Sequence, residues 1–249
     1  MTLNPVAFFV ANYPPLAESD PKYITADNNY ERMLNLELRT KKLVIFDLDG
    51  TLINAYPAII ESVNSTLTAF GYHRQKASVI RRAVGRGDRK LLESFVPGEN
   101  SDALLAYYRK HHAKALLRGS RLCAGAQSIL EYLTKKRYIL AVASNRPTRF
   151  SRIILRHLQI RSYFKYVLCA DVLKAGKPDP AILRLIMRRF KAHRQETVFV
   201  GDMVIDAQTA RAAGVTMILV RGGSSSYAEL LAQKPYRIIR RISLLRKIL

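Results

Sequence analysis

Short apolar runs recur along the chain, and each run stops abruptly at polar or small residues. A run that is apolar throughout, rather than alternating, is typical of a strand buried on both faces of a parallel sheet. We expect such strands at Leu43–Phe46, Tyr138–Ala143, Tyr166–Leu168, Thr197–Val200 and Val215–Val220. The pattern therefore predicts an α/β fold with a parallel sheet.

Between the runs, apolar residues recur every three or four positions, which predicts helices. Later helices are expected around Ile129–Leu133, Thr148–Leu158 and Ala207–Ala213. From about Tyr56 to Leu117, by contrast, the helical pattern continues without a strand. The positions that define these helices are Ile59, Ile60, Val63, Leu67, Phe70, Leu91, Leu92, Phe95, Leu104, Leu105, Tyr108, His112, Ala115 and Leu116. Helices that lie between two sheet elements in this way predict an inserted helical bundle.

The pattern divides the chain into an extension, an α/β core and an insertion. We place the N-terminal extension at residues 1–40, the core at residues 41–54 and 120–249, and the helical insertion at residues 55–119. One short helix is expected within the extension, across Asn29–Leu38. The extension is either a poorly ordered tail or a segment that packs on the core or on a partner.

Composition adds a strong positive charge to this picture. The 249 residues include 41 Lys and Arg against 19 Asp and Glu, a formal net charge of +22, while 49% are hydrophobic, as in a packed globular protein. Such a charge attracts nucleic acid, an acidic membrane surface or another polyanion, and a proteome rich in Arg would also produce it. The segment Lys234–Leu249, basic and apolar with no acid, is either a terminal strand and amphipathic helix or a basic flank for RNA, DNA or anionic lipid.

Two observations favour a cytoplasmic protein. The two cysteines, Cys123 and Cys169, have no metal-ligand spacing and are expected to be reduced core residues. The apolar stretch Val6–Val10 is too short to cross a membrane, and no basic residue precedes it as a secretion signal would require. We therefore expect no transmembrane segment.

Candidate chemistry begins where the first apolar run ends, in Asp47-Leu48-Asp49-Gly50-Thr51. Ligands of open α/β sheets bind at the carboxyl ends of strands, and residues two apart in an extended chain share a face. Asp47 and Asp49 can therefore turn toward one crevice, where two close anions need a cation such as Mg²⁺. The alternative interpretation is a strand that ends in a common Asp-Gly turn.

Three later segments also place polar side chains at the ends of predicted elements. Ser144-Asn145 offers a hydroxyl and an amide to a phosphate, although the same dipeptide is ordinary turn chemistry. In Gly176-Lys177-Pro178-Asp179-Pro180 the prolines fix the loop that carries the lysine, before a helix that can begin near the last proline. Its alternative interpretation is a surface lysine in a proline turn. Gly201-Asp202 is followed by Asp206, one turn later if a helix begins there.

Together these four segments resemble, in order, the four motifs of the haloacid dehalogenase superfamily of aspartate-based phosphatases. The resemblance covers about residues 41–239 and implies a Rossmann-like parallel-sheet core with an inserted helical cap that closes over the site. It implies that Asp47 is a nucleophile that forms an aspartyl-phosphate, and that Asp49 is the general acid and base. It also implies that Lys177 offsets charge on the nucleophile and on the phosphoryl oxygens.

The resemblance implies the remaining ligands as well. Phosphate would be bound by Thr51, Ser144, Asn145 and Lys177. Mg²⁺ would be held by the side chains of Asp47 and Asp202 and by the backbone carbonyl of Asp49, and Asp206 would support the metal from nearby.

One loop of the insertion and two departures bear on the substrate. Val84-Gly85-Arg86-Gly87-Asp88 resembles the substrate-specificity loop of phosphoglycolate phosphatases, in which Arg86 could pair with a substrate carboxylate or second phosphate. The alternative is an interhelical turn with an exposed arginine. Many relatives have Asp-Ser where this chain has Asn54-Ala55, and Ser or Thr where it has Met203.

The resulting hypothesis is a Mg²⁺-dependent phosphatase that hydrolyses a small phosphate monoester, with 2-phosphoglycolate as the leading substrate. A phosphoglucomutase-like phosphotransferase would use the same aspartates and differ in the acceptor. A phosphatase for nucleotides or nucleic-acid ends would use the positive surface directly. A non-catalytic polyanion-binding protein on the same fold is the third alternative, and the sequence does not indicate an oligomeric state.

Overall fold

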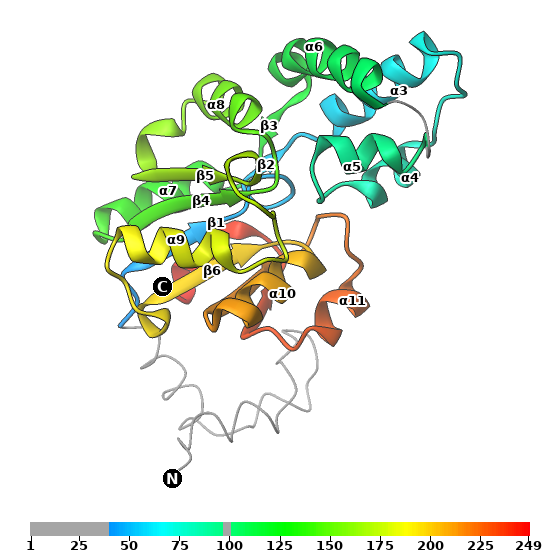
Figure 1. Cartoon of the computed structure of the whole chain (residues 1–249). Helices are drawn as coiled ribbons and strands as arrows, with labels where there is room; N and C mark the ends of the chain where they lie inside the picture. Colours follow the sequence, from blue (N-terminus) through cyan, green and yellow to red (C-terminus); the bar gives the residue numbers. More distant parts are fainter. Residues whose placement is uncertain (1–39, 97–100) are drawn as a thin grey trace.

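A computed structural model describes residues 40–96 and 101–249, so the predicted extension and its short helix lie outside the described residues. The core is a six-stranded sheet in which each strand runs parallel to its neighbours. In their order across the sheet, the strands are β5 (Tyr166–Cys169), β4 (Ile139–Ser144), β1 (Leu43–Phe46), β6 (Thr197–Gly201), β7 (Thr216–Val220) and β8 (Arg237–Ile239). The predicted α/β fold with a parallel sheet is confirmed (Figure 1).

Helices cover both faces of this sheet because successive residues of a strand point to opposite sides. In β1, Leu43 and Ile45 belong to the buried cluster on one face, and Val44 and Phe46 belong to the cluster on the other. The first face packs against α9 (Ala181–Arg189), α10 (Val204–Ala213) and α11 (Tyr227–Ala232). The second face packs against α7 (Ala126–Lys135), α8 (Thr148–His157) and the 3₁₀ helix η5 (Ile242–Lys247).

A helical insertion, residues 56–119, leaves the core after β1 and lies beyond one end of the sheet (Figure 1). It contains α3 (Tyr56–Ala69), α4 (Ala77–Ala83), α5 (Asp88–Glu93) and α6 (Ser101–Gly119). Its two ends are joined by an antiparallel ribbon of β2 (Ile53–Asn54) and β3 (Arg121–Leu122). Among the described residues, no helix combines the length and the apolar character needed to cross a membrane.

Two arginines of α4 fasten the insertion to the core. Arg81 donates from Nη2 to the carbonyl oxygen of Gly223 at 3.3 Å. Arg82 donates to the carbonyl oxygen of Ser224 at 2.9 Å and to the carboxylate of Glu229 in α11 at 2.7 Å. The insertion is therefore closed on the core in this structure.

A buried histidine lies where α6 packs on the core. The His112 ring stacks on Tyr108, with centroids 4.9 Å apart, and meets the edge of Phe150. Arg146 Nη1 lies 3.2 Å from His112 Nε2, and because a guanidinium can only donate, Nε2 must accept. Nδ1 then carries the proton and lies 3.0 Å from Ser62 Oγ. Burial and the Arg146 charge lower the pKa of His112 to about 2, so the ring is neutral.

The neutral state of His112 predicts a loss of stability in acid. The pKa of the folded state lies below the ordinary value of 6.5, so below that pH the unfolded chain binds one more proton than the folded chain. Between pH 6.5 and 4.5 this residue should lower the free energy of unfolding by about 2–3 kcal/mol, and His112→Gln should remove that part of the pH dependence.

Urea unfolding at the two pH values measures the effect. His157→Gln, which changes an exposed histidine of α8, should leave the pH dependence of the parent chain unchanged. An identical pH dependence in the parent and in His112→Gln would contradict the neutral buried ring.

Candidate active site

Three adjacent strands in the middle of the sheet carry the candidate side chains at their carboxyl ends. Asp47 and Asp49 follow β1, Ser144 ends β4, and Asp202 follows β6, in the sheet order β4-β1-β6. Carboxyl ends of neighbouring parallel strands meet at one edge, which is where ligands of open α/β sheets bind. Residues from distant parts of the chain are therefore brought together by the strand order.

Lys177 reaches this edge from the loop that follows β5. Its Nζ lies 2.7 Å from Asp47 Oδ1 and 2.6 Å from Asp206 Oδ1, and its side chain is 3% exposed. Asn145 holds the loop in place, since its Oδ1 accepts from the Lys177 backbone N–H at 2.8 Å and its Nδ2 donates to the Lys177 carbonyl oxygen at 3.0 Å. The structure thus brings the predicted lysine into direct contact with two of the predicted carboxylates.

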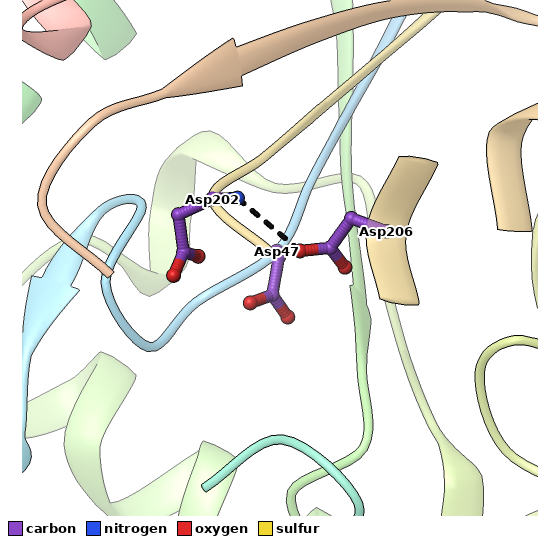
Figure 2. Close-up of side chains that lie close together, drawn as sticks. All are labelled: Asp47, Asp202 and Asp206. Atoms are coloured by element: carbon purple, nitrogen blue, oxygen red, sulfur yellow. Dashed lines mark hydrogen bonds between the residues drawn. The ribbon is translucent and has the colours of Figure 1, made fainter. Parts of the chain in front are cut away.

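Asp47, Asp202 and Asp206 form a cluster of buried carboxylates, with one oxygen of each within 4.8 Å of the others. Figure 2 shows the three side chains and the hydrogen bond that the Asp202 backbone N–H donates to Asp206 at 3.2 Å. Thr51 Oγ1 donates to Asp202 Oδ1 at 2.7 Å, whereas Asp202 Oδ2 is buried and has no partner in the described part of the chain. Three carboxyl groups share the single ammonium of Lys177, which contacts only two of them, Asp47 and Asp206. An all-oxygen cluster with an unpartnered buried oxygen fits a divalent cation.

The backbone packs against the Asp202 carboxylate at two glycines. A Cβ atom at Gly50 would lie 2.4 Å from Asp202 Oδ2, and a Cβ atom at Gly223 would lie 1.6 Å from the same oxygen. Both separations are far below van der Waals contact. Side chains at these two positions are therefore excluded as long as Asp202 keeps its place.

The shared burial changes the protonation of the cluster. Burial raises the pKa of Asp47 to about 7, although the charge of Lys177 acts in the opposite direction. Burial and the charges of Asp206 and Asp47 hold the pKa of Asp202 well above its usual range. Burial alone would lower the pKa of Lys177, but Asp206 and Asp47 outweigh it and raise that pKa. A cation in the cluster would favour the ionised carboxylates.

Asp49 lies outside this cluster and is paired with Arg146, two residues after Ser144. Arg146 Nε lies 3.0 Å from Asp49 Oδ2, and Nη2 lies 2.5 Å from Asp49 Oδ1. Arg146 is 7% exposed; burial would lower its pKa, but Asp49 raises it. Sequence reasoning missed this residue, and its place directly after the Ser144-Asn145 segment is the signal that could have found it.

Core and insertion together enclose a pocket of about 60 Å³. The core side chains that line it include Asp47, Asp49, Ser144, Asn145, Arg146, Lys177 and Met203. From the insertion, the pocket is lined by Ile59, Val84, Gly85, Gly87, Asp88, Leu91, Tyr108 and His112. Asn145 Nδ2 also donates to the Gly85 carbonyl oxygen at 2.9 Å, so the loop after β4 contacts both the lysine loop and the insertion.

Three predicted substrate ligands have other positions or partners. Arg86 is exposed and is not among the residues that line the pocket. The glycines on either side of it, both at positive φ, do line the pocket. Thr51 is fully buried, lies outside the pocket lining and donates to Asp202. Arg86 and Thr51 are therefore not among the residues that line this pocket, and their contact with a substrate stays a prediction. Asn145 lines the pocket, but its amide is bonded to backbone groups of Lys177 and Gly85.

Two curated bacterial proteins are similar to this chain over most of its length. Phosphoglycolate phosphatase 1 of Pseudomonas aeruginosa is 29% identical over 210 residues, which cover 81% of this chain and 77% of that protein. A phosphoglycolate phosphatase of Rhodospirillum rubrum is 31% identical over 195 residues, which cover 74% of this chain and 81% of that protein.

Solved structures share the fold. A crystal structure described as a predicted phosphoglycolate phosphatase from Haemophilus somnus has a TM-score of 0.77 at 27% identity, and the match covers 84% of this chain and 98% of that one. Residues 44–220 match the family described as haloacid dehalogenase-like hydrolase, a span that includes all four of the segments identified at the ends of the strands. The predicted superfamily is therefore confirmed, and the chain belongs to the haloacid dehalogenase-like hydrolase family.

Proposed function

We propose that this hydrolase is a Mg²⁺-dependent phosphatase that cleaves a small phosphate monoester, with 2-phosphoglycolate as its leading substrate. The position of Asp47 carries the proposal: its carboxylate lines the pocket, accepts from Lys177 and belongs to the buried acidic cluster. The curated relatives named phosphoglycolate phosphatase support the choice of substrate.

In the proposed reaction Asp47 attacks phosphorus in line with the ester oxygen. A bond forms from the carboxylate to phosphorus as the bond from phosphorus to the leaving oxygen breaks. Asp49 gives a proton to the leaving oxygen and then takes one from the water that hydrolyses the aspartyl-phosphate. Ser144 and Lys177 donate to the phosphoryl oxygens and stabilise the charge that develops there.

The acidic cluster would hold the metal. Asp47, Asp202 and the backbone carbonyl of Asp49 would bind Mg²⁺, with Asp206 in support. When bound, Mg²⁺ would neutralise the carboxylates and polarise the phosphoryl group. The unpartnered buried Oδ2 of Asp202 supports this assignment, because a carboxylate oxygen without a partner is costly to bury.

Pocket size and Arg146 favour a short ester that carries a second anionic group. The pocket, of about 60 Å³, is small, which favours a two-carbon ester over the sugar phosphate of the phosphoglucomutase-like alternative. Lys177 and Arg146 are the Lys and Arg residues among those that line the pocket. With Lys177 on the phosphoryl group, Arg146 is placed to bind a carboxylate. That carboxylate would also release Asp49 from its ion pair, so that Asp49 could reach the leaving oxygen.

Loss of the nucleophile is the first test. Asp47→Asn keeps the shape of the side chain but removes the attacking carboxylate, so kcat for 2-phosphoglycolate should fall by ~10³-fold or more. Release of inorganic phosphate in the presence of Mg²⁺ measures the rate. Asp102→Asn, whose side chain in α6 is 73% exposed, should keep the parent rate. Undiminished hydrolysis by Asp47→Asn would refute the assigned nucleophile.

Metal removal tests the cluster. In metal-depleted protein Asp202→Asn should raise Tm above that of the parent, because burial raises the pKa of the Asp202 carboxyl and so makes folding at neutral pH costly, whereas the neutral amide has no such cost. Mg²⁺ at about 100 times its Kd should raise Tm of the parent by roughly 5 °C or more, and Asp202→Asn should lose this response. Calorimetry with and without Mg²⁺ measures both effects, with Asp102→Asn as the matched control. A full Mg²⁺ response in Asp202→Asn would contradict the cation site.

A comparison of two esters tests the role of Arg146. In Arg146→Gln the ratio of kcat/KM for 2-phosphoglycolate to kcat/KM for ethyl phosphate, which lacks a carboxylate, should fall by roughly tenfold or more, or about 1.4 kcal/mol. The ratio is independent of the fraction of folded enzyme, which matters because Arg146 is buried. Equal losses on both esters would show that Arg146 acts through Asp49 and does not bind the substrate carboxylate.

A further inference from the structure

A second cavity, of about 340 Å³, shares no lining residue with the active-site pocket. It lies where the ribbon of β2 and β3, helix α4, the end of β7 and the segment after β8 meet. Five of its fifteen lining residues are arginines, and none of the fifteen is Asp or Glu. The arginines are Arg81, Arg121, Arg221, Arg240 and Arg241. Lys and Arg together make up 41 of the 249 residues of the chain, so arginine is concentrated in this cavity.

Three of these arginines contact neutral groups, namely two tyrosine rings and a backbone carbonyl. These contacts hold the guanidinium groups in place but do not neutralise their charge. The Arg81 guanidinium lies over the Tyr56 ring, 4.1 Å from its centroid, and Arg221 lies 4.7 Å from the centroid of Tyr227. Arg121 Nη1 donates to the carbonyl oxygen of Ser120 at 2.7 Å. The stacked guanidinium of Arg221 presents its N–H groups at the edge of the ring, where an oxyanion can accept from them. In Arg81, Nε and Nη2 already donate to the carbonyl oxygens of Gly222 and Gly223, so Arg81 contributes mainly its positive charge.

Two other residues that line the cavity also suit an anion. Tyr56 is 2% exposed, and its hydroxyl oxygen is buried without a hydrogen-bond partner among the described residues. Asn54 also lines the cavity, and its side-chain amide is a neutral donor.

We propose that this cavity binds a small anion with two or more phosphate groups, either free pyrophosphate or the phosphate chain of a nucleotide. Guanidinium groups pair with phosphate oxygens through two parallel hydrogen bonds, and a cavity lined by several arginines suits an anion with more than one phosphate group. The volume is within the range of small-molecule sites and well above that of the active-site pocket. Such a ligand would contact the insertion through Arg81 and the core through Arg221.

Calorimetric titration with pyrophosphate and with ATP tests the proposal. The full chain is first depleted of metal on a chelating resin, so that hydrolysis plays no part. We expect one anion per chain, bound more weakly as salt rises from 50 to 200 mM NaCl. The double variant Arg221→Gln/Arg241→Gln changes two exposed residues and should weaken binding at least tenfold.

A matched pair of arginines elsewhere separates this site from a general charge effect. Arg188→Gln/Arg189→Gln on α9 removes the same charge, and Arg189 also lies 4.7 Å from a tyrosine ring centroid, that of Tyr166. This control should bind as the parent does, and an equal loss in both double variants would overturn the proposal.

The two probes distinguish the sources of the anion. Binding of ATP at least as tight as that of pyrophosphate assigns the cavity to nucleotides, and tighter binding of pyrophosphate assigns it to the free anion. Absence of binding by both overturns the proposal. Because the titration needs no catalysis, its failure would leave the proposed phosphatase activity untouched.

Discussion

The buried ammonium of Lys177 is the interaction on which the site depends. It contacts Asp47 after β1 and Asp206 in α10, and so joins three segments that lie far apart in the sequence. Without this ammonium, the buried carboxylates would lose their nearest counter-charge, at a cost of several kcal/mol. The strands bring the acidic groups to one edge of the sheet, and the ammonium of Lys177 lowers the free-energy cost of burying them together.

The loop after β4 extends this arrangement to the insertion. Asn145 bonds backbone groups of Lys177 and of Gly85, and Arg146 bonds the carboxylate of Asp49 and the ring of His112. Two adjacent residues therefore orient the lysine loop, the candidate acid and base, and the closed insertion at the same time.

Local sequence predicts the parallel sheet and the charged groups at its edge, because an apolar run that stops at a carboxylate places Asp47 or Asp202 at a strand end. The apolar pattern does not identify Arg146, which differs from the other basic residues of a chain with 41 Lys and Arg by its burial and by its place directly after Ser144-Asn145. The sequence leaves the orientation of Arg86 open, because the conformation of a glycine-rich loop decides where its side chain points. The ribbon of β2 and β3 has two residues in each strand, too few for any periodicity to indicate it.

Gly223 has a consequence for how the molecule opens. Its α-carbon is pressed against the carboxylate of Asp202, and its carbonyl accepts the hydrogen bond from Arg81 of the insertion. The backbone at Gly223 therefore packs against the acidic cluster and is also hydrogen-bonded to the insertion. If the insertion moved away from the core, the hydrogen bond from Arg81 to Gly223 would break and the backbone beside Asp202 would be free to move. The same motion would then admit the ester and allow the cation to exchange.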